Sequence, residues 1–189
     1  MRKFGVAVAA IVAFAGLASA QETIDNPEFA SWSKFKPGTS VTMKNTTTAG
    51  DVKSEMTITT RLLEAGADKL VVEMTIVASF NGMELKQPPM KRDIAKTITL
   101  PKGTPKPDPN AKPKIDGAKF EEGTDTVKVA GGEFKAKWYK TTFEAGGNTV
   151  ETKAWTSDEV PGGLVKAETT TSGANPATIK MEVTELKKP

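Results

Sequence analysis

The sequence contains no cysteine and no histidine among its 189 residues. Without cysteine there is no disulfide framework, no thiol nucleophile and no bacterial lipoprotein processing, which attaches lipid to a cysteine. Without either residue type a zinc site is excluded, and the missing histidine also removes the Ser-His-Asp triad. These absences predict a protein that is not an enzyme; a hydrolase that works with carboxylates alone stays open as a disfavoured alternative.

Long apolar runs are missing after the first twenty residues, so no later segment is predicted to cross a membrane. Residues 1–20 form a bacterial-type signal peptide, with a positively charged start, an apolar stretch over 4–17, and the small residues Ala18 and Ala20 before the cleavage point. We therefore predict a mature protein that starts near Gln21 and is exported to the periplasm or the extracellular space of a bacterium. The alternative is an uncleaved anchor, but the apolar stretch is shorter than a membrane span.

Little net charge remains once the predicted signal peptide is removed. The whole sequence has 26 Lys and Arg against 23 Asp and Glu, a net charge of +3. Residues 1–20 hold two basic residues and no acidic one, so residues 21–189 carry 24 against 23, a net charge of +1. A nearly neutral domain has little long-range attraction for nucleic acid, so no nucleic-acid partner is predicted. The length of 21–189 suits a single domain.

The start of this domain has the signals of a short helix. Asn26 is a favourable N-cap, and the Pro and Glu that follow it suit a first helical turn. Phe29, Trp32 and Phe35 come at three-residue spacing, which places them on one face of the helix. We interpret the segment as an amphipathic helix whose aromatic side chains dock on the edge of a sheet. In the alternative, the same three side chains form a lid over a ligand cavity.

From residue 39 onward the hydrophobic period is two, which is typical of half-buried antiparallel strands. The longest alternation covers residues 69–80, and the Asn-Gly pair that follows is a strong hairpin signal. Similar runs and turns recur to the end of the chain and indicate about nine or ten strands. The predicted fold class is all-β: a single antiparallel curved sheet or half-barrel, or a sandwich, with a short N-terminal helix.

Residues 101–114 interrupt the strands with five prolines and four lysines. Proline lacks the N–H that a sheet interior needs, so this segment is predicted to be an exposed loop between two groups of strands. The alternative role is contact with a peptide or an anionic surface.

The candidate binding residues are aromatic and methionine side chains. Four aromatic residues cluster in the second group of strands, where core packing is the simplest interpretation. The alternative is the wall of an apolar ligand pocket, completed by methionines, because Met adapts its shape to varied ligands. The candidate wall residues are Met56, Met74, Trp138, Tyr139, Phe143 and Trp155.

Acidic side chains form two pairs but no metal motif. Glu73 and Glu84 lie on neighbouring strands of a predicted hairpin, and Asp158 and Glu159 are adjacent before a turn. Paired carboxylates can perform acid–base chemistry, but we interpret these as solvated strand and turn residues. The loop aspartates lack the spacing of a calcium loop, so no metal site and no cofactor are predicted.

Two stretches give a resemblance to known proteins: residues 32–41, WSKFKPGTSV, and a second stretch over 133–138, 154–157 and 160–166. They resemble uncharacterised small secreted bacterial proteins that are rich in β-structure. The long antiparallel strands are also similar in style to the LolA/LppX-like lipoprotein and lipid carriers, which implies a half-barrel around acyl chains. Those carriers plug the half-barrel with helices, whereas one short helix is evident here. No functional residue is carried over.

The sequence thus predicts an exported, non-enzymatic envelope protein that binds an apolar small molecule or lipid within a curved β-sheet. The alternative is a structural or protein-interaction module with a filled core. The two differ in whether the inward aromatic and methionine side chains leave room for a ligand.

Overall fold

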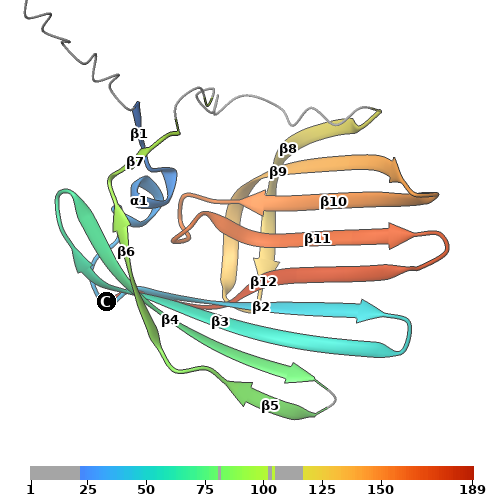
Figure 1. The fold of residues 1–189 in the computed structure, drawn as a ribbon, viewed down its shortest axis with the longest axis horizontal. Helices are drawn as coiled ribbons and strands as arrows, with labels where there is room; N and C mark the ends of the chain where they lie inside the picture. The colour runs from blue at the N-terminus through green and yellow to red at the C-terminus, as the bar shows by residue number, and fades with distance from the viewer. Residues whose placement is uncertain (1–21, 81, 102–103, 105–116) are drawn as a thin grey trace, which may run out of the picture.

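The computed structural model describes residues 22–80, 82–101, 104 and 117–189. The predicted signal peptide, and the predicted 101–114 loop except Pro101 and Thr104, lie outside the described residues. Within those residues the chain forms one helix and twelve strands (Figure 1). They are β1 (Thr23–Asp25), α1 (Pro27–Trp32), β2 (Ser40–Ala49), β3 (Val52–Ala65), β4 (Lys69–Phe80), β5 (Met83–Lys86), β6 (Met90–Ala95), β7 (Thr97–Thr99), β8 (Lys119–Val129), β9 (Gly132–Ala145), β10 (Asn148–Thr156), β11 (Leu164–Ser172) and β12 (Ala177–Lys187).

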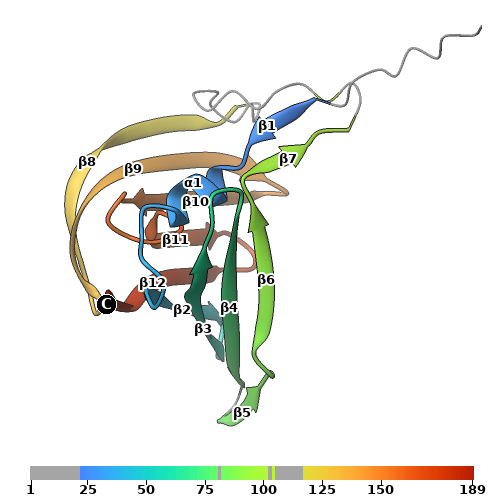
Figure 2. The same cartoon turned by 90° about the vertical axis from the view of Figure 1, so that its left-hand side faces the viewer.

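Ten strands form one antiparallel sheet, and β1 and β7 pair as a separate two-stranded ribbon. The order is β5-β4-β3-β2-β12-β11-β10-β9-β8, with β6 also paired to β4. Hairpins between neighbours in sequence build each half of the sheet, and the ladder between β2 and β12 joins the halves. No ladder among the described residues joins β8 to β5 or β6, so the sheet is open. The predicted all-β class is confirmed, as a single curved sheet and not as a sandwich (Figure 2).

Three β-bulges lie at the same end of the sheet and bend it there. The extra residues are Leu63 in β3, Val165 in β11 and Thr184 in β12. The β8–β9 hairpin is also bent, as Figure 2 shows, and its turn reaches β12, where Gly131 N donates to Val183 O at 3.1 Å. A Cβ on Gly131 would lie 2.6 Å from Val183 Cγ1, so this close approach requires glycine.

The hydrophobic core lies at this bulged end, which we call the core end. The opposite end, with the turns after β2 and β4, is the open end. Trp32, only 4% exposed, brings α1 into the core. The buried cluster consists of Trp32, Val41, Leu62, Leu70, Val72, Ile94, Val127, Phe134, Ala136, Trp155, Val160, Val165 and Val183. Because nearly all fully buried large side chains belong to this cluster, the packing that holds the fold is concentrated at one end.

Helix α1 begins as the sequence predicts. Asn26 Oδ1 accepts a hydrogen bond from Glu28 N at 3.0 Å, and Pro27 occupies the first position. Asn26 Nδ2 also donates to Ala95 O at 2.8 Å, which ties the cap to β6. Arg92 of β6 donates to the Glu28 carboxylate at 2.8 Å, and this hydrogen bond holds the pKa of Glu28 below its ordinary value. The helix is therefore fixed over the core end by a cap, an ion pair and a buried Trp.

Candidate functional site

The strand register assigns every residue of the sheet to one of two faces, because directly opposed side chains in an antiparallel ladder point the same way. Arg92 pairs with Val72 in the β4–β6 ladder and bonds Glu28 of α1. The helix therefore lies on the face that carries Val72, which we call the inner face; the other is the outer face. In Figure 2, α1 lies between the bent β8–β9 hairpin and the strands β4 and β6.

Beyond the core, toward the open end, the inner face carries large hydrophobic side chains, with polar side chains such as Thr47, Thr141 and Thr169 between some of them. Of the eight large hydrophobic side chains exposed among the described residues, seven lie on the inner face, and the eighth, Ile98, is in β7. The seven are 41% to 72% exposed. Together with the half-buried hydrophobic side chains between them they form what we call the open apolar face. It comprises Met43, Val52, Met56, Ile58, Met74, Ile76, Phe80, Met83, Leu85, Met90, Tyr139, Phe143, Val150, Ile179 and Met181.

Away from the core end, where Phe134, Ala136 and Trp155 are buried, the outer face has the opposite character. Ion pairs bridge neighbouring strands there: Lys44 Nζ lies 2.7 Å from Glu55 Oε2, and Lys140 Nζ lies 2.7 Å from Glu151 Oε2. The hydrogen bond that Lys140 donates to the Glu151 carboxylate keeps the pKa of Lys140 above its ordinary value. A solvated, charge-paired outer face and an uncovered hydrophobic inner face make the inner face the candidate binding surface.

The structure divides the six predicted wall residues between the two faces. Met56, Met74, Tyr139 and Phe143 all belong to the open apolar face. The other two, Trp138 and Trp155, lie on the outer face. Four of the six residues predicted to form one wall therefore share the inner face, and the other two do not.

Trp138 and Trp155 form a directly opposed pair in the β9–β10 ladder. Lys153 Nζ lies 4.2 Å from the Trp138 ring centre and 4.8 Å from that of Trp155, and Lys166 Nζ lies 4.8 Å from the Trp155 ring. These are cation–π contacts. Trp155 is 7% exposed and belongs to the buried cluster, and Trp138 packs against that cluster. The two rings are therefore part of the packing and are covered by lysine side chains.

The three aromatic residues near α1 contact the core. Trp32 belongs to the buried cluster, and Phe29 and Phe35 are half-buried and pack against it. These positions suit the docked helix of the first interpretation; the alternative of a lid stays a prediction.

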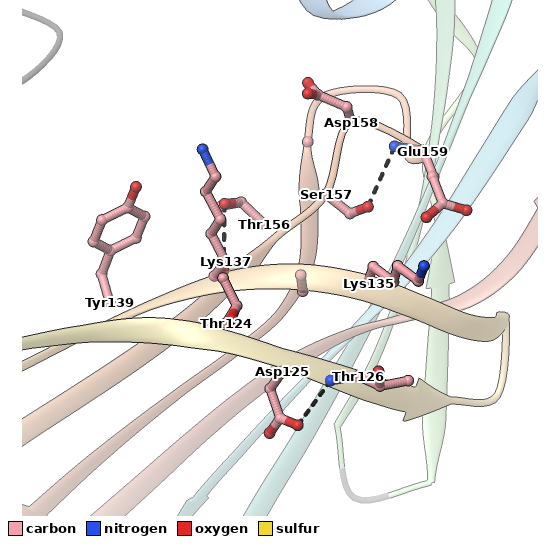
Figure 3. A pocket seen from close by; sticks show the side chains of 12 residues that line it. Thr124, Asp125, Thr126, Lys135, Lys137, Tyr139, Thr156, Ser157, Asp158 and Glu159 are labelled. Atoms are coloured by element: carbon pink, nitrogen blue, oxygen red, sulfur yellow. Dashed lines mark hydrogen bonds between the residues drawn. The ribbon is translucent and has the colours of Figure 1, made fainter.

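A polar pocket adjoins the open apolar face at Tyr139. It has a volume of about 900 Å³ and lies between the β8–β9 hairpin and the loop 157–163 that joins β10 to β11. Lys135, Lys137 and Tyr139 contribute from β9 (Figure 3). Asp158 and Glu159 contribute from the loop, where Glu159 N donates to Ser157 Oγ at 3.3 Å.

The charges around this pocket are of both signs. Lys34 Nζ, just beyond α1, lies 2.7 Å from Asp158 Oδ1. This hydrogen bond, with a smaller contribution from Lys137, holds the pKa of Asp158 below its ordinary value. Asp125 lies on the far side of the β8 ribbon in Figure 3 and accepts from its neighbour Thr126 N at 2.7 Å. Lys135 and Lys137 are the cations of the pocket, and Glu159 contributes a carboxylate to the same lining.

Sequence reasoning missed Lys135, Lys137 and Asn45 as functional candidates. Asn45 lies on the inner face between Met43 and Thr47, at the parity that the sequence already showed to be apolar. A polar residue at an apolar parity was the available signal. No sequence pattern indicates the polar pocket, because the pocket is created by the bend of the β8–β9 hairpin. Among the described residues no three of His, Cys, Asp and Glu converge to hold a metal ion.

Comparisons with known proteins give two similar solved structures. A candidate exported protein with a YmcC-like fold from Bacteroides fragilis is 12% identical, covers 82% of this chain and 97% of its own, and has a TM-score of 0.44. A candidate lipoprotein from Parabacteroides distasonis is 16% identical, covers 80% of this chain and 96% of its own, and has the same TM-score. The chain matches no protein-family model and no curated protein sequence.

Neither structure is described as a LolA/LppX-like carrier, so that part of the resemblance stays a prediction from sequence. Within the described ranges, no helix has the length and apolar character needed to cross a membrane. The function of this chain is therefore inferred from its own residues.

Proposed function

We propose that this protein is an exported, non-enzymatic binding protein for an amphipathic ligand. The acyl chain of the ligand lies on the open apolar face, and its polar headgroup lies in the adjoining pocket beside Lys135 and Lys137. One observation carries the proposal: among the described residues, seven of the eight exposed large hydrophobic side chains share the inner face of the curved sheet.

The area involved supports a ligand of this kind. Neighbouring strands lie about 4.8 Å apart, so the seven strand intervals from β5 to β9 span roughly 34 Å. Uncovered hydrophobic surface on this scale is unfavourable in water, and a bound acyl chain would remove much of it from solvent. Met43, Met56, Met74 and Met181 supply flexible side chains that fit chains of varied shape.

Native mass spectrometry of the mature protein, purified from cells that export it, tests the proposal directly. We expect a bound mass in the range of an acyl-bearing amphiphile. Purified protein is then titrated with stearate in competition with a fluorescent fatty acid.

Two variants supply a matched comparison for this titration. Ile179 on the open apolar face is 41% exposed, and Ile98 in the β1–β7 ribbon is 39% exposed. We expect Ile179→Ser to weaken stearate binding about threefold to tenfold, because it removes one apolar contact. Ile98→Ser should leave binding unchanged. Protein without a bound amphiphile that also fails to bind stearate would overturn the proposal.

The interaction-module alternative gives a different result in the same experiments. In that case the protein co-purifies with a protein partner, Ile179→Ser weakens that association, and stearate neither binds nor competes with the partner.

A further inference from the structure

Asn45 lies in the middle of the open apolar face. In the β2–β3 ladder it is directly opposite Met56, and in the β2–β12 ladder it is directly opposite Met181. The same cross-strand row continues through Ala167 and Ala154 to Tyr139. Along this cross-strand row the carboxamide therefore stands among methyl, thioether and aromatic side chains, although polar Thr47 follows it on the same face of β2.

The side-chain oxygen of Asn45 is buried and has no hydrogen-bond partner among the described residues. Two other buried side-chain atoms also lack a partner among the described residues: Asn148 Oδ1, on the inner face at the β9–β10 turn, and Trp155 Nε1, on the outer face. Thr152 and Thr169 of the inner face are satisfied, because their hydroxyls lie 3.0 Å apart and bond each other. An unpaired buried polar group destabilises the folded state by more than a typical hydrogen bond stabilises it. Each such group in a native protein therefore needs an explanation. The carboxamide carries an acceptor and a donor, and rotation of its terminal torsion can present either one at the same place.

Building on the proposed function, we propose that Asn45 hydrogen-bonds a hydroxyl group part-way along the acyl chain of the ligand. A hydroxyl donates and accepts, so it matches either orientation of the carboxamide. An all-hydrocarbon chain on this face would cover Asn45 and leave it unpaired, which disfavours that ligand. The ligand class is therefore a hydroxylated acyl chain, and the preference is set by one residue.

The position of the hydroxyl along the chain follows from the strand order. Four strand intervals separate β2, which carries Asn45, from β9, which carries Tyr139 at the edge of the polar pocket. At about 4.8 Å each they amount to roughly 19 Å across the sheet, and less where the sheet curves. With the headgroup at the pocket, the hydroxyl that reaches Asn45 lies well inside the chain and not beside the headgroup.

Three fatty acids test this directly with the full mature protein: stearate, 12-hydroxystearate and 2-hydroxystearate. We expect 12-hydroxystearate to displace a fluorescent fatty acid at about threefold to tenfold lower concentration than stearate, which is the range of one hydrogen bond. The hydroxyl of 2-hydroxystearate lies beside the carboxylate, so this compound should bind like stearate. Equal binding of 12-hydroxystearate and stearate by the wild-type protein overturns the inference and needs no variant.

Asn45→Leu should abolish the preference, because stearate then meets a continuous apolar surface while the hydroxyl loses its partner. Thr47→Val, two residues along the same strand and face, is the control and should keep the preference. If the preference survives in Asn45→Leu, Asn45 is not its source. If no fatty acid binds at all, the proposed function itself fails; if all three bind equally well, only the role of Asn45 fails. If the protein binds an N-acyl amide more tightly than 12-hydroxystearate, the proposed hydroxyl partner of Asn45 is wrong, and an amide group of the ligand is its partner instead.

Discussion

Leu62 and Leu85 provide a direct test of the division between the core end and the open apolar face. Both side chains lie on the inner face, but Leu62 is fully buried and Leu85 is 66% exposed. Leu62→Ala should destabilise the protein by about 2–5 kcal/mol, since it removes a buried side chain and leaves a cavity. Leu85 has about a third of its surface buried, so Leu85→Ala should cost about a third of a full burial, roughly 0.5–1 kcal/mol.

Urea denaturation of the mature protein, followed by tryptophan fluorescence, measures both free energies of unfolding. In a domain of this size about 1 kcal/mol shifts Tm by roughly 2–4 °C, so Leu62→Ala should lower Tm by about 4–20 °C and Leu85→Ala by about 1–4 °C. Leu85→Ala should also weaken stearate binding. If the two variants lose the same free energy of unfolding, the Leu85 side chain is buried in solution, and the open apolar face is not exposed to solvent.

Three further changes test the elements around the site. Replacing Asn26 with Ala should cost about 1 kcal/mol in urea denaturation, because α1 loses its cap, and the loss should exceed that value if the bond to Ala95 O adds to it. The pKa of Glu28 is lowered from 4.5 in the folded state, so its pairing with Arg92 stabilises above about pH 4.5, and this stabilisation is lost as pH falls through the lowered value. Arg92→Met should therefore lower Tm near neutral pH, and its effect should shrink as the pH is lowered below 4.5; an effect that does not change with pH would contradict the ion pair. Gly123→Ala should cost about 1–3 kcal/mol, because a Cβ there lies 2.7 Å from the Trp138 ring; full stability in thermal melts would show that the ring moves aside freely.

Local features of the fold could be predicted from the sequence. α1 begins after the Asn26 cap and β4 spans the alternating run at 69–80, as expected, because caps and strand alternation depend on neighbouring residues. The end of the helix was predicted wrongly: α1 ends at Trp32, so Phe35 lies beyond it. The choice between a sheet and a sandwich could not be made, since it depends on the pairing of β2 with β12, two strands far apart in the chain. The β1–β7 ribbon, where Thr23 pairs with Thr99, was missed for the same reason.

The candidate site shows the same limit more sharply. Residues 138 and 139 are neighbours on one strand, so alternation alone should have placed Trp138 and Tyr139 on opposite faces. Grouping them by aromatic character ignored this rule. Which of the two faces stays uncovered could not be read from the sequence, because it depends on where α1 docks and on three bulges that gather the core at one end. The polar pocket depends on the bend of the β8–β9 hairpin, which no local pattern encodes.

The ladder between β2 and β12 also sets the order of events when the chain is made. Most ladders within each half of the sheet are hairpins, which form quickly between neighbours in sequence, and β6 returns to β4 after only one intervening strand. The seam, from Ser40 opposite Lys187 to Ala49 opposite Ala177, closes only when the last strand has been delivered. Until then β2 presents an unpaired edge, on which another chain could add a strand. How long each new molecule is exposed to aggregation therefore depends on how soon β12 reaches and pairs with β2, and not only on the stability of the finished sheet.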